Sequence, residues 1–415
     1  MILTQIIVVA VWSMFLVRVS PSAAIFYVVL AIYSIIPQVG YEYFPELSMA
    51  IGAYFGQGII TSYQIFFLTN LAIIPFALYL SSRITLSFGL KFRLQRFSGR
   101  LALRIFFSLY FGSMWLIFLE NINSINYTIS SASGGETFSV SIFPILNKFG
   151  LGLAVLVYAY RNLDKELRLI SYIAVLSELF FAFKLGARVD IVCLFVGLAL
   201  LHLGDRRLRG ADIIYAILIM PFIFSFMIVV EAARNQVSFS ETGLALQDLL
   251  AKDYFGPGHT VFGLIYYQHV EPLEQVVSNA VNSFPGLHRV FLDDFPLLSE
   301  RVGSMISDGS IIISRTQGYA FHILGEGYVF MGMWGAVYNF LALLASFSFF
   351  QVYANSLSSR GKTIFIALVG TIIFPLIRSQ FVYFPRFFII YLLPIMFLHF
   401  LFFSNYRSRG RSYGT

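Results

Sequence analysis

Ionisable side chains stand directly before and within an apolar run in the stretch from Ser314 to Phe340, SRTQGYAFHILGEGYVFMGMWGAVYNF. Its first half carries Arg315, His322 and Glu326, whereas its second half is apolar enough to enter a membrane. Such side chains are expensive to bury beside a membrane span, so they need a reason to be there. An arginine can hold an anion, and a histidine or a carboxylate can take a proton from a reacting hydroxyl.

The same stretch aligns its polar residues if it is helical. With spacing i, i+4, i+7 and i+11, one face then carries Arg315, Tyr319, His322 and Glu326. A second face, of small residues suited to close helix packing, carries Gly325, Gly332 and Ala336. We expect His322 to be the base or to bind an acceptor, and Glu326 to position an arginine. The alternative is that Glu326 only pairs with an arginine and His322 only hydrogen-bonds in the core.

Arginines stand near the ends of several apolar runs that are predicted to meet one membrane surface: Arg188, Arg234, Arg315, Arg378 and Arg386. A guanidinium binds phosphate oxygens at two points and keeps its charge in a low dielectric. We therefore expect these arginines to surround a lipid-linked phosphate or diphosphate. Arg188 lies in FAFKLGARVDI, a short hairpin between two apolar runs. Its alternative role is to reach the lipid headgroups while Asp190 offsets one charge.

The composition places the chain in a membrane. Of its 415 residues, 58% are hydrophobic and only 12% are charged, and the mean hydropathy is +0.79. Soluble domains carry about 25% charged residues, so a water-soluble fold is excluded. The apolar runs are continuous, as expected of membrane-spanning helices. We therefore predict an all-α polytopic membrane protein.

Eleven apolar segments are predicted to cross the membrane: residues 2–17, 22–39, 60–82, 102–119, 140–160, 168–185, 189–204, 213–233, 327–353, 363–378 and 386–403. They divide the chain into three parts. Residues 1–233 hold eight spans, residues 234–326 form an exterior loop, and residues 327–415 hold three spans and a basic tail. The first segment lacks the basic start and the cleavage site of a signal peptide, so we expect it to be retained as a span.

Basic residues are unevenly distributed between alternate loops. Lys and Arg gather in residues 83–100, 161–168, 206–209 and 360–362 and in the tail, whereas the loops 40–59 and 120–139 contain neither. Loops rich in Lys and Arg remain in the cytoplasm. We therefore expect the N-terminus outside and the C-terminus inside. The pI near 9.3 follows from this asymmetry and does not indicate nucleic acid as a partner.

The exterior loop is long enough to carry a function of its own. Its segments ETGLALQDLLAKD and PLEQVVSNAV have the periodicity of short amphipathic helices, and TVFGLIYY is apolar but too short to cross a membrane. We expect a small cap, rich in aromatic side chains, that lies on the outer membrane surface.

Motifs for several other chemistries are missing. No Gly-rich phosphate loop and no serine elbow is present. His259, His269 and His288 lack the spacing of a zinc site, and Cys193 is the single cysteine. The sequence therefore gives no reason to expect a bound nucleotide or a zinc ion.

The pattern resembles a family of oligosaccharide repeat-unit polymerases of bacterial surface polysaccharide, the Wzy-type O-antigen polymerases, which are related to the O-antigen ligases. The layout of many spans with one large, late exterior loop is similar over essentially the whole chain. The Gly-Ala-Arg run that ends at Arg188 is similar to a Gly-small-Arg element of that family. The stretch Tyr319–Phe340 is similar to its late element.

The resemblance implies a glycosyltransferase fold of the GT-C kind in a bacterial cytoplasmic membrane, and a reaction without metal or other cofactor. Donor and acceptor would be oligosaccharides on undecaprenyl diphosphate, with membrane lipids and a regulator of chain length as further partners. The arginines would stabilise the diphosphate leaving group, and His322 or Glu326 would activate the acceptor hydroxyl. The aromatic side chains that would bind the sugars are Tyr319, Tyr266 and Tyr267.

Three alternatives to a polymerase stay open. A flippase or other transporter of the same lipid-linked oligosaccharide would also need arginines, but spread through a central cavity. An O-antigen ligase would use the same donor. A purely structural or partner-binding membrane subunit would leave the crowding of arginines at one surface unexplained.

Overall fold

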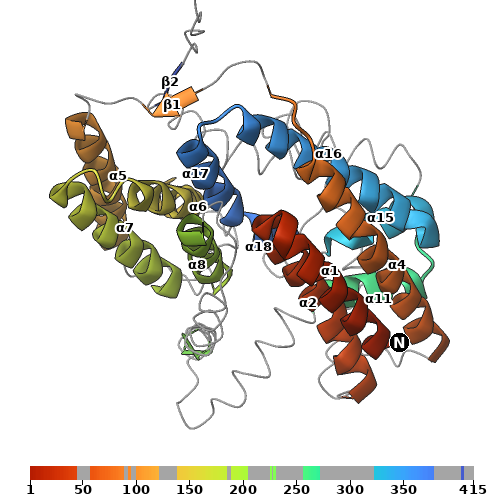
Figure 1. The fold of residues 1–415 in the computed structure, drawn as a ribbon. Helices are drawn as coiled ribbons and strands as arrows, with labels where there is room; N and C mark the ends of the chain where they lie inside the picture. Colours follow the sequence, from red (N-terminus) through yellow and green to blue (C-terminus); the bar gives the residue numbers. More distant parts are fainter. Residues whose placement is uncertain are drawn as a thin grey trace, which may run out of the picture.

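The structure is a computed structural model. It describes residues 1–43, 57–87, 92–94, 100–120, 138–184, 188–203, 225–226, 228–229, 256–271, 322–377 and 403–405. In these ranges the chain is almost entirely helical (Figure 1). The helices are α1 (Ile2–Val19), α2 (Pro21–Tyr43), α4 (Gln57–Ser82), α5 (Arg100–Glu120), α6 (Phe138–Ala159), α7 (Lys165–Lys184), α8 (Arg188–Leu203), α11 (Gly256–Tyr266), α15 (Ile323–Met331), the 3-10 turn η5 (Gly332–Trp334), α16 (Gly335–Asn355), α17 (Ser359–Gly370) and α18 (Ile373–Ile377). Two short strands, β1 (Phe92–Leu94) and β2 (Phe403–Asn405), complete the set.

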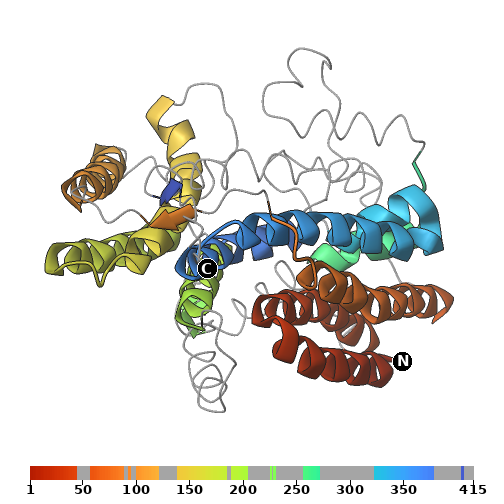
Figure 2. The same cartoon turned by 45° about the horizontal axis from the view of Figure 1, so that its top comes forward.

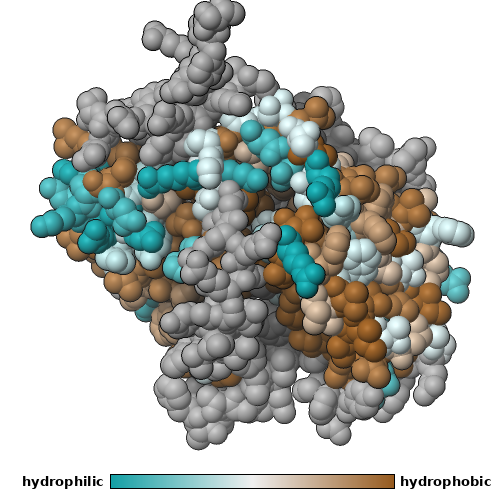
Figure 3. All heavy atoms as spheres, in the orientation of Figure 1, coloured by the Kyte–Doolittle hydropathy of each residue, from teal (hydrophilic) through white to brown (hydrophobic). Residues whose placement is uncertain are grey.

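Apolar helices long enough to cross a bilayer confirm an all-α membrane protein. Among the described residues five candidates qualify by length and hydropathy: Ile2–Val19, Pro21–Val39, Gly58–Ser82, Leu103–Glu120 and Ile323–Asn355. An 18-residue helix is about 27 Å long, close to the thickness of the hydrocarbon core. Large apolar side chains of α1, such as Leu3, Val11 and Met14, face outward. Hydrophobic surface accordingly covers the region of α1 and α2 (Figure 3).

The helices form two groups with α17 between them (Figure 1). The first group contains α1, α2, α4, α11, α15 and α16, and the second contains α5, α6, α7 and α8. In the first group α16 lies along α4 (Figure 2). Aromatic rings join its helices, as where Tyr63 of α4 stacks on Phe262 of α11 with ring centroids 3.6 Å apart.

The segment predicted as one span, residues 327–353, is interrupted. Helix α15 ends at Met331, the turn η5 follows, and α16 starts at Gly335. Gly332 has φ +56° and ψ −133°, a conformation that favours glycine and lets the chain reverse. The hydropathy pattern does not reveal this break, because the residues of the turn are themselves apolar. Helix α15 has only nine residues and is too short to cross the membrane by itself.

The prediction that Arg315, Tyr319, His322 and Glu326 share one helical face is wrong, because the helix does not include His322. That residue has an extended backbone, with φ −87° and ψ 128°, and it caps the start of α15 instead of lying inside a helix. The second expected face is also wrong, because Gly332 lies in the turn and not in line with Gly325. The small-residue contact that the structure does contain joins Gly327 to Gly335.

Segments far apart in the sequence meet at one end of the molecule, which we call the basic end. Strand β1 pairs with β2 in antiparallel register, with Arg93 opposite Ser404. The Asn355 side chain at the end of α16 donates to the Ile84 carbonyl at 2.7 Å. Arg360 at the start of α17 donates to the Ala159 carbonyl at 2.9 Å. These contacts bring together the segments in which Lys and Arg gather.

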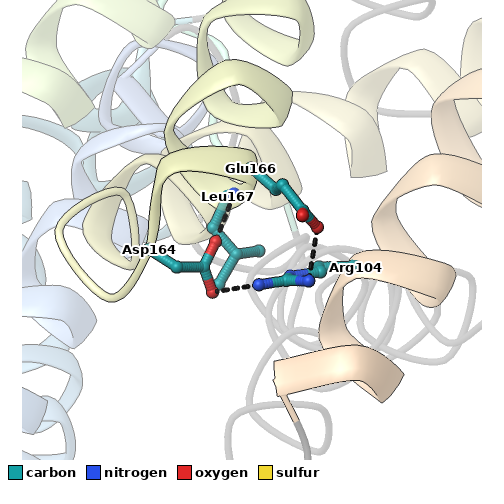
Figure 4. Close-up of polar contacts among 4 residues, drawn as sticks. All are labelled: Arg104, Asp164, Glu166 and Leu167. Atoms are coloured by element: carbon teal, nitrogen blue, oxygen red, sulfur yellow. Dashed lines mark hydrogen bonds and ion pairs between the residues drawn. The ribbon is translucent and has the colours of Figure 1, made fainter.

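An ion-pair cluster closes the basic end of the second helix group (Figure 4). Arg104 of α5 contacts Asp164 at 3.0 Å and also pairs with Glu166 of α7. Asp164 in turn accepts a hydrogen bond from the Leu167 backbone N–H at 2.7 Å and so caps α7. The cluster fixes the start of α7 against α5.

Candidate functional site

A buried carboxyl of α15 is held by a tyrosine of α16. Glu326 is fully buried, and the Tyr338 hydroxyl donates to its Oε1 at 2.6 Å. Tyr338 is only partly buried. The pair exists because the turn η5 folds α15 back onto α16, which brings two residues twelve positions apart into contact. Ionisable side chains inside a membrane protein are expensive and usually functional, so this pair is the centre of the candidate site.

A glycine contact sets how closely α15 and α16 approach. A Cβ on Gly335 would lie 2.6 Å from the Tyr328 backbone nitrogen, and a Cβ on Gly327 would lie 2.6 Å from Asn339 Oδ1. No real side chain fits at either position, so the two backbones touch directly. Glu326 precedes Gly327 immediately, and its contact with Tyr338 therefore depends on this close packing.

Asn339 links three helices beside the pair. Its Nδ2 donates to Asn70 Oδ1 of α4 at 2.8 Å and to the Leu324 carbonyl of α15 at 3.0 Å. Its Oδ1 has no hydrogen-bond partner among the residues that the structure describes. Because a buried amide that loses its partner is costly, Asn339 and Asn70 hold α4, α15 and α16 in one arrangement.

His322 is a structural cap whose two ring nitrogens are both occupied. Nδ1 accepts the Leu324 backbone N–H at 3.2 Å, and Nε2 lies 3.3 Å from the Ser34 hydroxyl. The Ser34 hydroxyl itself donates to the Leu30 carbonyl, so it accepts from Nε2. This arrangement needs a neutral ring with its proton on Nε2. The fully buried ring also packs edge-on against Phe67.

An amide pair extends the polar network into α1. Gln5 and Gln38 donate to each other's side-chain oxygens, at 2.9 and 2.8 Å. Gln5 also donates to the Gln64 carbonyl of α4, and the Gln64 side chain donates to Glu42 at 3.3 Å. Gln5, Gln38 and His322 are all fully buried. The network therefore ties α1, α2, α4 and α15 together through polar contacts in an apolar surrounding.

The depth of the site follows from α4, which crosses the whole first group. Its 26 residues span about 39 Å, and Asn70 lies near its middle. Phe67, against which His322 packs, is less than one turn from Asn70. Helix α16 ends at Asn355, at the basic end, so its start at Gly335 lies at the opposite end. Because α15 leads through η5 into the start of α16, α15 runs from His322 away from the basic end. Glu326 therefore lies between the middle of the helices and the end opposite the basic end.

The structure places only some of the expected site residues. Arg188 starts α8, but its side chain lies outside what the structure describes. Also outside the described ranges are Arg234, Arg315, Tyr319, Arg378 and Arg386. Tyr266 and Tyr267, the candidate sugar-binding residues, are 45% and 40% exposed, and their rings meet edge to face at 4.9 Å. They follow the buried part of α11 at its end.

Helix α11 is more deeply buried than the expected surface cap. Val261, Phe262 and Leu264 are fully buried in the main core. A Cβ on Gly258 would lie 3.0 Å from the Tyr63 hydroxyl, so α11 packs tightly against α4. The segment TVFGLIYY therefore packs into the core of the first helix group, and only Tyr266 and Tyr267 at its end are exposed.

Sequence reasoning missed Tyr338, Asn339, Asn70 and the amide pair. Tyr338 has no helical spacing to Glu326, because a turn separates them. Gln5, Gln38 and Asn70 could have been identified by residue type, because each is an isolated amide side chain inside an apolar run. Such residues usually hydrogen-bond across helices in membranes.

The arrangement can move a proton and hold helices together. A carboxyl, a phenol and a nearby amide lie within one polar network, whereas no group of three or more His, Cys, Asp or Glu side chains suited to a metal occurs in the described ranges. The comparisons with known proteins match no family model, no curated protein and no solved structure.

Proposed function

We propose that this chain is a polymerase of bacterial surface polysaccharide. It joins oligosaccharide repeat units carried on undecaprenyl diphosphate, at the outer face of the cytoplasmic membrane. The observation that carries the proposal is the buried Glu326, held by Tyr338 inside an apolar helix bundle. A carboxyl in such a place suits a reaction on a substrate whose lipid tail stays in the outer leaflet.

The proposed reaction is a transfer of a glycan from lipid diphosphate to a sugar hydroxyl. The bond between the anomeric carbon and the diphosphate oxygen breaks, and a bond to the acceptor oxygen forms. The acceptor proton passes to a base, while the diphosphate leaves with the electron pair of the broken bond. General-base assistance of this kind typically contributes about 10²–10⁴-fold.

Glu326 is a better candidate for the base than His322. Both nitrogens of His322 are engaged, by the Leu324 N–H and by Ser34, so the ring has no free lone pair. Tyr338 is partly buried and donates to Glu326. A proton from an acceptor hydroxyl would therefore reach Glu326 through the Tyr338 hydroxyl. His322 keeps a different role, as the cap that positions α15.

The leaving group would be held by arginines and the sugars by aromatic rings. Arg188 starts α8 at the end of the second helix group away from the basic end. The exposed rings of Tyr266 and Tyr267 lie at the corresponding end of the first group. With Arg188 we propose Arg234, Arg315, Arg378 and Arg386 as ligands of the diphosphate, because guanidinium groups bind phosphate at two points.

The topology completes the proposal. The proposal includes eleven spans, a GT-C-like fold, an N-terminus outside and a C-terminus inside. Support for the orientation comes from the Lys- and Arg-bearing segments, which meet at one end of the molecule. The basic end would then face the cytoplasm. The site around Glu326 would face the outer leaflet, where lipid-linked repeat units are presented.

Interrupted helices support transport of the same lipid-linked oligosaccharide as a second candidate function. Helix α15 is separated from α16 by η5, and α17 is separated from α18 by a two-residue turn. Transporters often build substrate sites from such broken helices. A transporter would move the lipid-linked unit without forming a glycosidic bond.

A test of the arginine role uses cells in which the gene is replaced by variants. Arg188→Ala should abolish polymer and leave single repeat units, whereas Arg188→Lys should restore polymer only in part, because an ammonium lacks the planar two-point contact. Arg168→Ala is the matched control, since Arg168 is exposed on α7 near the basic end. Gel analysis of polysaccharide length, with immunoblots of protein level, gives the readout. A normal ladder from Arg188→Ala would contradict the proposed role.

A further inference from the structure

A histidine and a carboxyl meet just beyond the end of α11, in a segment that the proposed reaction does not use. His269 Nε2 lies 3.2 Å from Glu271 Oε1. The Glu271 side chain is 1% exposed, whereas the His269 side chain is 33% exposed. The pair therefore joins a buried carboxyl to an imidazole ring that reaches the surface of the molecule.

The backbone around this pair is fixed to two helices. The His269 N–H donates to the Leu264 carbonyl of α11 at 3.0 Å, across a turn in which Gln268 has φ 49°. A left-handed residue at this place is typical of the Schellman end of a helix. The Glu271 N–H then donates to the Val329 carbonyl of α15 at 2.9 Å. The pair is thus held in a set position, as a preorganised binding group requires.

The contact with Glu271 leaves the second ring nitrogen of His269 available. A carboxylate only accepts hydrogen bonds, so the proton of a neutral ring lies on Nε2 and points at Glu271. Nδ1 then carries a lone pair, and it makes no hydrogen bond with the residues that the structure describes. His322 differs, because both of its ring nitrogens are engaged and its ring is fully buried. Of these two histidines, only His269 offers a ring nitrogen to a ligand.

The surroundings of Nδ1 favour a ligand that donates hydrogen bonds. An ionised phosphate has only acceptor oxygens, so it cannot bond to a lone pair on nitrogen. Helices α11 and α15 both end near the pair, at Tyr266 and Met331, and the C-terminal end of a helix carries partial negative charge. Anions are therefore disfavoured here. A hydroxyl group is neutral and can donate to Nδ1, so it is the matching class of group.

Exposed aromatic and apolar side chains adjoin the pair. Tyr266 and Tyr267 precede it in the chain and are both exposed. Val270, between the two residues of the pair, is also exposed and lies near the turn η5, since a Cβ on Gly332 would be 3.9 Å from its Cγ2. Trp334 of η5 is exposed as well. Aromatic rings beside a hydroxyl-binding group suit a sugar, which has apolar faces and a rim of hydroxyls.

We propose that His269, oriented by Glu271, binds a hydroxyl group on the sugar part of the lipid-linked oligosaccharide. Nδ1 accepts the hydrogen bond, and the rings of Tyr266 and Tyr267 lie beside the sugar. The diphosphate of the same substrate does not fit here, because it has no proton to donate. The inference rests on the proposed function for the identity of the ligand, whereas its test measures binding and needs no polymer to form.

Equilibrium binding to the purified full-length protein tests this subsite. The probe is a fluorescently labelled repeat-unit oligosaccharide that mild acid has freed from its lipid diphosphate. His269→Gln keeps an amide at the position of Nε2 but loses the group at Nδ1, so Kd should rise about 3–10-fold. His269→Asn keeps an amide at the position of Nδ1 and should bind more tightly than His269→Gln. His202→Ala is the control, since His202 is exposed near the end of α8, and it should bind like the wild type.

The opposite order of the two variants would overturn the subsite. Wild-type affinity of His269→Gln with weak binding by His269→Asn would mean that the histidine only holds Glu271 in place. Absence of saturable binding to the wild type would also contradict the proposal. Failure of the polymerase proposal gives a different result: no longer glycan forms in vesicles, while the predicted order of affinities is kept.

A measurement on the wild-type protein covers the case in which the variants do not fold. Diethyl pyrocarbonate modifies accessible imidazole nitrogens, and mass spectrometry of peptides locates the modified residue. The oligosaccharide should slow the modification of His269 and leave that of His202 unchanged. An unchanged rate at His269 with saturating oligosaccharide would contradict the subsite.

Discussion

Glu326 and Tyr338 show how an ionisable group can be kept inside a membrane bundle. The phenol hydroxyl donates to the carboxyl at 2.6 Å, a length typical of a strong hydrogen bond to an acidic group. Because Tyr338 is partly buried and Glu326 fully buried, the tyrosine is the more accessible of the two. The pair thus has a fully buried carboxyl and a more accessible phenol hydroxyl, and we propose that the hydroxyl meets the substrate.

We expect Glu326→Gln to lower polymer formation by about 10²–10⁴-fold, since glutamine keeps the shape but cannot take the proton. Tyr338→Phe should lower it by a similar factor, because the proposed proton path from the acceptor to Glu326 runs through the Tyr338 hydroxyl. Tyr353→Phe on the same helix, near the basic end, is the control and should have no effect. The measurement is polymer length per unit of folded protein. Full activity of Glu326→Gln would remove the carboxyl from the mechanism.

His322 gives a test that separates a cap from a base. Asparagine is among the best N-cap residues, so His322→Asn should keep the fold and most of the activity. His322→Ala should lose about 0.5–2 kcal/mol of stability, as removal of a cap usually does. The thermal midpoint and polymer formation are measured for both variants. A His322→Asn protein with normal stability and no polymer would return the base role to the histidine.

At the scale of elements, the half-helix α15 is what creates the site. It runs from the cap at His322 to Met331, reverses at Gly332 and packs against the start of α16. The contact between Gly327 and Gly335 allows this reversal to close without side chains between the two backbones. The position of Glu326 relative to Tyr338 is therefore a property of two short segments and one turn.

A methyl group at Gly335 should open this contact. We expect Gly335→Ala to cost about 1–3 kcal/mol of stability through overpacking, and to lower activity as well by separating Glu326 from Tyr338. Gly112→Ala on α5 is the control, because nothing lies within 4 Å of a Cβ there and alanine favours a helix. Thermal unfolding of both purified variants gives the comparison. Equal midpoints would mean that the backbones of α15 and α16 can move apart freely.

Within the described ranges, hydropathy predicted where several helices lie but not where they turn. The predicted spans 2–17, 22–39 and 60–82 correspond to α1, α2 and α4, because long apolar runs have few other stable forms in a membrane. The break at Gly332 was missed, since Met, Trp and Gly in the turn are as apolar as the helices around it. The polar partners were missed because contacts such as Asn70 with Asn339 depend on packing between distant segments. Glu326 itself was found, because a carboxyl in an apolar run stands out.

At the scale of the whole molecule, a basic end and an apolar body give the chain a direction. Strand pairing and side-chain hydrogen bonds join the Lys- and Arg-bearing segments at the basic end. At the end opposite the basic end lie the exposed rings of α11 and the turn η5. Trp334 of η5 is 76% exposed. Tryptophan and tyrosine at the end of a membrane bundle are typical of the headgroup region.

Cysteine labelling in whole cells can test this direction. In a Cys193→Ala background, Val270→Cys should react with a membrane-impermeant maleimide, because Val270 is exposed at the end away from the basic segments. Lys165→Cys, exposed at the basic end, should react only after the cells are opened. Labelling of Lys165→Cys in intact cells would reverse the orientation and move the proposed site to the cytoplasmic side.

Extension of lipid-linked repeat units by the purified protein in lipid vesicles tests the proposed polymerase reaction most directly. Only undecaprenyl-diphosphate-linked oligosaccharide is supplied, with no nucleotide sugar. The polymerase proposal predicts a ladder of longer glycans and the release of one undecaprenyl diphosphate for each new bond, both lost in Glu326→Gln. Movement of the lipid-linked unit across the vesicle membrane without any longer glycan would contradict the proposal and identify the chain as a transporter.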